Sequence, residues 1–130
     1  MAAKHAVVSP IGTYSTVKQV AAGSGRTKGN PELVGGILVI AFDTYAAGVD
    51  HLLIYKAAQV EVTASGANAE IASVNFNTLL GKVYWDDSAK KVTNVSTSNT
   101  LIGRALVTAD YSGGVPVGAT LLIELDPSAA

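Results

Sequence analysis

Residues 82–95 read KVYWDDSAKKVTNV, and this stretch decides the fold class of the chain. Its two outer segments, 82–86 and 91–95, are rich in valine and aromatic residues, whose side chains pack well on a pleated sheet. The polar residues 87–90 between them have the length of a hairpin connection. The stretch therefore predicts a β-hairpin, with an aspartate at its turn that accepts hydrogen bonds from nearby amides.

The same composition extends over all 130 residues. The chain contains 16 valines, 7 isoleucines and 11 threonines, and these β-branched residues lose side-chain freedom in helices. Its 13 glycines and 4 prolines help to divide it into short segments, a spacing typical of small all-β domains rather than of βαβ units. We therefore predict an all-β fold, a small β-barrel or β-sandwich with an extended N-terminal arm and long loops.

Hydrophobic patterning predicts further strands outside the hairpin. The nearly continuous apolar run 33–42 is typical of a central strand buried on both faces. For residues 67–80 a short helix is one possibility. Some of their apolar residues have helical spacing, whereas their asparagines disfavour a helix. The remaining predicted strands are 13–20, at an edge, and 51–55, 59–63, 101–107 and 119–125.

The beginning of the chain differs from the rest. Residues 21–31 read AAGSGRTKGNP, with three glycines, two cations and almost no side chain to bury, which predicts a flexible loop or arm. We therefore divide the chain into an N-terminal arm or loop segment (1–31), a β-domain (32–126) and a C-terminal tail (127–130).

The charge of the chain changes at nearly the same place. Residues 1–30 contain four bases and no acid, whereas residues 31–130 contain five bases and ten acids. One interpretation is a solvated loop whose charges only aid solubility. The other is an arm that docks on an acidic surface of another protein or of a neighbouring subunit. For the second interpretation the predicted contact residues are Lys4, Lys18, Arg26 and Lys28.

The composition also argues against several classes of partner. A formal net charge of −1 provides no broad positive field for nucleic acid. The apolar run 33–42 is shorter than the roughly 20 residues of a membrane helix, and the first ten residues lack the apolar core of a signal peptide. We expect no nucleic-acid partner and no membrane partner.

No catalytic motif is visible in the sequence. The chain has no cysteine, no G-x-S-x-G or H-E-x-x-H motif and no EF-hand loop. His51 stands beside Asp50, but neighbouring strand residues point to opposite faces of a sheet, which disfavours a proton relay between them. We predict that the protein is not an enzyme and that it has no cofactor and no metal site.

The aromatic residues allow two interpretations. In the first, Tyr84, Trp85, Ile102 and Leu122 are core or subunit-interface residues, since a single tryptophan in a valine-rich strand usually packs inside. In the alternative, Trp85 or Tyr111 is the stacking platform of a carbohydrate- or host-surface-binding β-module.

The second half of the chain resembles a known family. The motifs that carry the resemblance are the KVYWDD of residues 82–87, the KVT of 91–93, the NTLIGRA of 99–105 and the apolar ATLLIEL of 119–125. They resemble the capsid decoration proteins, or cement proteins, of tailed bacteriophages. The region 31–63 is similar to the more variable first half of that family.

The resemblance implies a structural protein of the virion. Such a protein binds the outer surface of the assembled head and joins neighbouring subunits of the major capsid protein, which stabilises the shell. The resemblance also implies a homo-oligomer, with a homotrimer favoured over a homodimer, on the outer surface of the capsid after synthesis in the bacterial cytoplasm.

Overall fold

The computed structural model describes residues 7–64 and 70–128. Within these residues every regular element is a strand, so the all-β prediction is confirmed. In chain order the strands are β1 (Val7–Gln19), β2 (Pro31–Val34), β3 (Ile37–Ala41), β4 (His51–Thr63), β5 (Asn75–Phe76), β6 (Lys82–Asp86), β7 (Lys91–Thr93), β8 (Thr100–Ala105), β9 (Ala109–Asp110) and β10 (Thr120–Leu125). No helix that could cross a membrane is found among the described residues.

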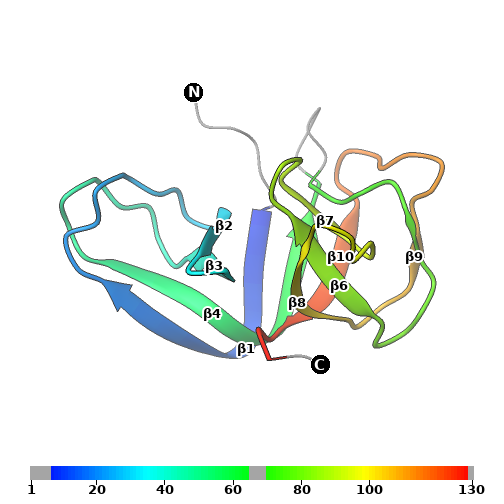
Figure 1. Cartoon of the computed structure of the whole chain (residues 1–130), viewed down its shortest axis with the longest axis horizontal. Coiled ribbons are helices and arrows are strands. Elements are labelled where there is room, and N and C mark those ends of the chain that lie inside the picture. Colours follow the sequence, from blue (N-terminus) through cyan, green and yellow to red (C-terminus); the bar gives the residue numbers. More distant parts are fainter. Residues whose placement is uncertain (1–6, 65–69, 129–130) are drawn as a thin grey trace.

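One strongly curled antiparallel sheet forms most of the molecule (Figure 1). Its strands follow the order β2-β3-β4-β10-β8-β6-β7, and β1 pairs with β4 outside this path. The sheet curls into a half-barrel, while β5 and β9 form a separate two-stranded sheet beside it. The structure therefore has the curvature of the predicted barrel, with open sheet edges at β1, β2 and β7.

The core fills the inside of the half-barrel. Alternate residues of β10, namely Leu121, Ile123 and Leu125, are each at most 1% exposed, as the period of two along a strand requires. Trp85 from β6 and Ile102 from β8 pack into the same cluster. A cavity between these side chains has a volume of only about 10 Å³, so the core is closely packed around it.

The predicted hairpin 82–95 is present. β6 pairs antiparallel with β7, with Trp85 opposite Val92. Asp86 begins the turn, and its Oδ1 accepts hydrogen bonds from the amides of Ser88 (3.1 Å) and Ala89 (3.0 Å). This is the capping that the sequence predicts for the aspartate.

The predicted single strand 33–42 is wrong. The structure divides this run into β2 and β3, which form a hairpin at the edge of the sheet. Gly35 and Gly36 make the turn with φ values of 58° and 80°, a left-handed backbone that glycine adopts at no steric cost. The hairpin was not predicted, because the residues on both sides of the turn are apolar and resemble one continuous strand.

The two predicted strands 51–55 and 59–63 are one strand, β4, which is the longest member of the sheet together with β1. β1 pairs with β4 from Val7↔Thr63 to Gln19↔His51, with register shifts around Gly12 and between Ser15 and Thr16. The sequence predicted a strand only over 13–20 of this segment. Residues 7–19 of the expected arm 1–31 are thus a strand of the sheet, because their backbone is paired along the whole of β4.

Residues 70–80 contain no helix. The segment instead contains the short strand β5 between bends and a turn. Ile71 forms a parallel bridge with Val92, and the amide of Ala72 donates to the carbonyl of Val92 (2.8 Å). Residues 67–69 of the segment for which a short helix was considered lie outside the described residues.

Candidate functional site

Two loops meet at the end of the long β1–β4 ribbon, and we call them the tip (residues 20–30 and 42–50). They are joined by backbone hydrogen bonds, including Ala22 N to Val49 O (3.1 Å) and a pair of bonds between Arg26 and Tyr45 (2.9 and 2.8 Å). The loop 21–31 that the sequence presents as flexible is therefore held against a second loop. In Figure 1 the tip lies at the opposite end of the molecule from β9.

Arg26 fixes the tip to the sheet. Its Nε donates to Glu32 Oε1 (2.8 Å) and its Nη2 to Glu32 Oε2 (3.2 Å), which is a two-point pair between guanidinium and carboxylate. Its Nη1 donates to Gln19 on β1 and to His51 on β4. The side chain of Arg26 is only 11% exposed. Arg26 therefore has a structural role in holding the tip, and its role as a charged contact for a partner stays a prediction.

The charge separation along the sequence is also reduced in the folded molecule. The loop that contains Asp43 and Asp50 packs on the loop that contains Lys28. Asp50 Oδ1 accepts a hydrogen bond from the amide of Ala21 (3.1 Å). Acids from the second loop therefore lie among the bases of the first, and the tip is not a purely basic arm.

Exposed side chains form a row near the tip, across β1, β4 and the residue that follows β3. Lys18 on β1 is directly opposite Leu52 on β4, and Ala41 on β3 is opposite Leu53, which places Phe42 opposite Leu52. Directly opposite residues of neighbouring strands project from the same face. The row therefore reads Lys18, Leu52 and Phe42, with the last two 36% and 38% exposed.

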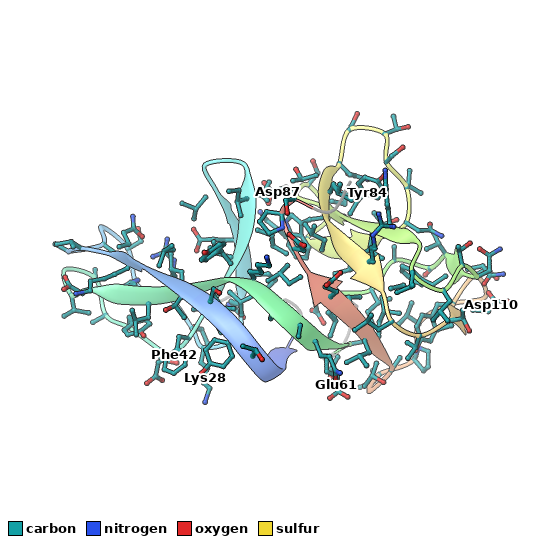
Figure 2. The ribbon with its side chains drawn as sticks, turned by 90° about the horizontal axis from the view of Figure 1, so that it is seen from below. Lys28, Phe42, Glu61, Tyr84, Asp87 and Asp110 are labelled. Carbon is teal, nitrogen blue, oxygen red and sulfur yellow. The ribbon has the colours of Figure 1, made fainter. Side chains whose placement is uncertain are left out.

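Two further residues extend this row. The ring of Tyr14, which is 40% exposed, lies 6.0 Å from the ring of Phe42. Lys28 is beside Phe42, since the amide of the next residue, Gly29, donates to the carbonyl of Ala41 (3.0 Å), and Figure 2 shows the two side chains together below the ribbon. We call this surface the ribbon face; its residues are Tyr14, Lys18, Lys28, Phe42 and Leu52.

The ribbon face has the composition of a protein-binding surface. Aromatic and aliphatic side chains form its middle and two exposed lysines its ends. Lys18 and Lys28 are thus the two predicted contact residues that the structure brings to one exposed surface, while Lys4 lies outside the described residues. Tyr14, Phe42 and Leu52 were missed, because the sequence does not reveal that residues 14, 42 and 52 are neighbours.

The four predicted core or interface residues divide between two environments. Trp85 (0% exposed) and Ile102 (1%) lie in the core. Tyr84 and Leu122 are half-buried, because each alternates with core residues on its strand and faces away from the barrel interior. Trp85 cannot be the stacking platform of a carbohydrate module, since no part of its side chain is accessible.

Tyr111 is also engaged within the protein. Its hydroxyl donates to the carbonyl of Thr120 (2.7 Å), and its ring packs edge-on against Phe76 with the centroids 6.5 Å apart. These contacts fix the loop after β9 rather than present a free aromatic ring.

His51 is fully buried. Because Arg26 Nη1 can only donate, His51 Nδ1 accepts that bond (2.9 Å), and the proton resides on Nε2, which donates to the carbonyl of Ala46 (2.9 Å). The ring of Tyr45 stacks on the imidazole at 4.6 Å. Both ring nitrogens are thus used internally, which leaves neither for a substrate. Among the described residues no group of three or more His, Cys, Asp or Glu side chains is arranged to hold a metal ion.

Three aspartates have lowered pKa values, and each lies in a turn or next to one. The Lys90 ammonium, and secondly the indole N–H of Trp85, hold the pKa of Asp87 below its ordinary value. Hydrogen bonds from the hydroxyl and amide of Ser112 lower the pKa of Asp110, and Ser128 does the same for Asp126. Hydrogen bonds to the charged form explain these shifts without a catalytic role.

The structure is that of a small all-β protein whose ribbon face exposes apolar and basic side chains. A family model described as phage cement protein matches residues 11–120. The chain therefore belongs to the phage cement protein family, as the motifs of its second half predict. No curated protein and no solved structure matches it. Membership implies a capsid-associated structural role in the virion and points to a non-enzymatic protein.

Proposed function

We propose that this protein binds the outer surface of the phage head through its ribbon face and joins neighbouring subunits of the major capsid protein, which stabilises the shell. The observation that carries the proposal is the row of Phe42, Leu52 and Tyr14 between two exposed lysines. Such a row buries apolar area at its centre on contact, and its lysines favour an acidic partner surface. The family supports the capsid as that partner.

The rigidity of the tip supports this function. A partner that binds a loop must order it, and this costs conformational entropy. Here the bonds of Arg26 to Glu32, Gln19 and His51 order the tip before any contact is made. The ribbon face is therefore presented in one shape, and more of its contact energy remains available for binding.

The proposal includes synthesis in the bacterial cytoplasm and self-association into a homotrimer, in preference to a homodimer. Several copies of one weak contact surface, held in one oligomer, bind a repeating lattice much more tightly than a single copy does. Light scattering of the purified protein measures its native mass and tests this part separately.

Co-sedimentation with mature heads that lack the protein tests the ribbon face. We expect wild-type protein to bind saturably, in a fixed ratio to the major capsid protein, and to raise the temperature at which heads release DNA. Phe42→Ser and the double variant Lys18→Glu/Lys28→Glu should each reduce binding at least tenfold.

Lys82→Glu/Lys91→Glu is the matched control, because it makes the same charge change on the β6–β7 hairpin, away from the tip. It should bind as the wild type does. Normal binding by both ribbon-face variants, or equal loss in the control, would show that another surface meets the head.

A further inference from the structure

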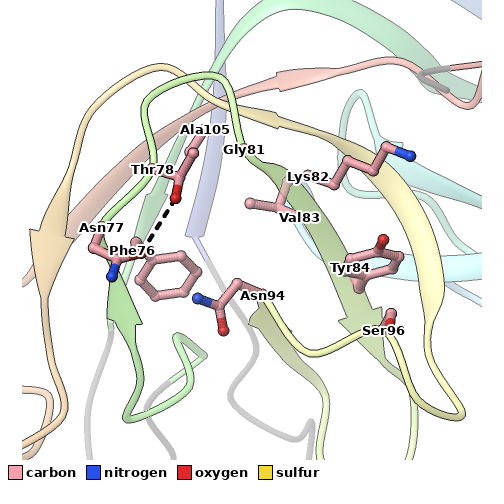
Figure 3. A pocket seen from close by; sticks show the side chains of 10 residues that line it. All are labelled: Phe76, Asn77, Thr78, Gly81, Lys82, Val83, Tyr84, Asn94, Ser96 and Ala105. Carbon is pink, nitrogen blue, oxygen red and sulfur yellow. Dashed lines mark hydrogen bonds between the residues drawn. The ribbon is translucent and has the colours of Figure 1, made fainter.

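A second surface feature is a pocket of about 370 Å³ beside β6 (Figure 3). Strand β7 ends at Thr93, so the first residues of β6 have no strand beside them on that side. Asn94 and Ser96 lie there instead and form one wall of the pocket. The segment after β5 forms the other wall. Strand β6, which lines the pocket, lies in the same half of the molecule as β9 and away from the tip (Figure 1).

The walls of this pocket are fixed by hydrogen bonds within the protein. Asn94 Nδ2 donates to the carbonyl of Asn75 (2.9 Å), which joins the chain after β7 to β5. The amide of Gly81 donates to the carbonyl of Thr78 (3.0 Å), and the amide of Ala105 donates to the carbonyl of Gly81 (2.9 Å). A Cβ at residue 81 would lie 2.9 Å from the Thr78 carbonyl oxygen, so glycine permits this wall. The site is therefore formed before any ligand arrives.

The lining is polar but almost uncharged. Amide and hydroxyl groups come from Asn77, Thr78, Asn94 and Ser96, and no carboxylate is among the lining residues. The one charged lining residue is Lys82, and Figure 3 shows its ammonium directed away from Asn94 and Phe76. Asn94 uses Nδ2 for Asn75, and its Oδ1 is an acceptor on the same side chain.

Two aromatic rings line the pocket, and they differ in exposure. Tyr84 is half-buried on the outer face of β6 and lies next to Ser96 in Figure 3. Phe76 and Val83, both nearly fully buried, form an apolar floor. A ligand for this site has hydroxyl groups for the amides and an apolar C–H face for the ring.

We propose that this pocket binds a pyranose saccharide of one or two rings. Its volume is at the lower end of the range for small-molecule sites, about 300–1,000 Å³. A phosphorylated ligand would need more cationic groups, and a metal ion would need carboxylates. The site differs from the stacking platforms that the sequence indicated, Trp85 and Tyr111, neither of which lines it. Binding there does not depend on the capsid contact, and the two sites lie in different halves of the molecule.

Saturation-transfer NMR and calorimetry on the isolated protein test the proposal with glucose, galactose, mannose, N-acetylglucosamine and their β-linked disaccharides. We expect saturable binding of at least one of them. Tyr84→Ala should weaken it at least tenfold, and Ser96→Trp, which fills the pocket from an exposed position, should abolish it. Tyr14→Ala, a matched tyrosine change on the ribbon face, should bind normally.

Thermal unfolding of each variant separates loss of the site from loss of the fold, and Ser96→Trp should unfold at the wild-type temperature. The proposal is overturned if none of the saccharides binds, or if binding persists in Ser96→Trp. Because these measurements contain no capsid, their failure leaves the head-binding proposal intact, and failure of head binding leaves this one intact.

Discussion

Arg26 and His51 are 25 residues apart in the chain, yet the guanidinium of one donates to Nδ1 of the other across 2.9 Å. Glu32 pairs with the opposite side of the same guanidinium, and Ala46 accepts the proton of the imidazole Nε2. One arginine thus joins β1, β2 and β4 to both loops of the tip. The ribbon face depends on this group, since Phe42 and Lys28 lie on the loops that it holds.

Removing the guanidinium should destabilise the protein. Arg26→Ala leaves the carboxylate of Glu32 and the buried Nδ1 of His51 without their partner. We expect a loss of about 1–3 kcal/mol in the free energy of unfolding, the lower part of the range for broken ion pairs because Glu32 is 45% exposed. Urea denaturation at neutral pH measures it.

Two controls accompany Arg26→Ala. Lys18→Ala removes a cation that is exposed, and it should change stability by less than about 0.5 kcal/mol. Arg26→Lys should recover only part of the loss, because an ammonium cannot reach Glu32 and His51 with the fork of a guanidinium. Full stability of Arg26→Ala would mean that the tip does not depend on this network.

Trp85 should be the most important single side chain of the core. Trp85→Ala should cost about 3–5 kcal/mol, because the indole is fully buried and its removal leaves a large cavity. Trp85→Phe keeps most of the packing but loses the hydrogen bond from Nε1 to Asp87 (3.0 Å), and it should cost less than half as much. Equilibrium unfolding in urea compares them; a near-neutral alanine variant would place the indole at the surface.

A methyl group at residue 103 should prevent normal folding. The Cβ of Gly103→Ala would overlap the carbonyl oxygen of Glu124, so β8 and β10 must separate. We expect a loss of about 3 kcal/mol or more, or insoluble protein. Gly113→Ala is the matched control, because nothing lies within 4 Å of its Cβ and its φ is not positive. Equal melting temperatures for the two variants would contradict the close approach.

Acid should weaken the hairpin turn. The pKa of Asp87 is lowered in the folded state, chiefly by Lys90 and then by Trp85. A group with a lowered folded pKa contributes stability that is present above its unfolded pKa, about 4, and is lost as the pH falls through the folded value. The urea concentration at the midpoint of unfolding should therefore decrease as the pH is lowered from about 5 to about 2.5.

Asp87→Asn should show a smaller fall over this range than the wild type, and Lys90→Ala should also reduce it, because it removes the main cause of the shift. The effect is small, since the Asp87 side chain is 49% exposed. An identical pH dependence in wild type and Asp87→Asn would show that other carboxylates carry it.

Much of the fold could be predicted from local pattern. The hairpin 82–95, the strands near 101–107 and 119–125 and the all-β class follow from β-branched residues that alternate between polar turns. The hairpin of β2 and β3 was missed although Gly35-Gly36 between apolar residues is a hairpin signal. The run was interpreted as one strand buried on both faces. In the sequence, two apolar strands joined by a two-residue turn have nearly the same pattern as one long buried strand.

The candidate site was predicted in part. Lys18 and Lys28 lie on the ribbon face, but Arg26 serves the fold, and the apolar residues between the lysines were not identified. The sequence around Arg26 and Lys28 does not show which of these two cations is bonded within the fold and which is exposed. Their difference arises because Arg26 faces Glu32, Gln19 and His51, whereas Lys28 is exposed.

The sequence alone determined the strand chemistry, the hairpin turn at Asp86 and membership of the cement family, because each depends on residues that are close together in the chain. Tertiary structure alone decided which side chains meet. Lys18, Leu52 and Phe42 form one row because β1, β4 and β3 pair in one register, and Gly12 lies at a shift in that register. A register shift of one residue would turn these side chains to the other face. Pairing between distant strands is fixed by the packing of the whole core, and no short segment contains that information.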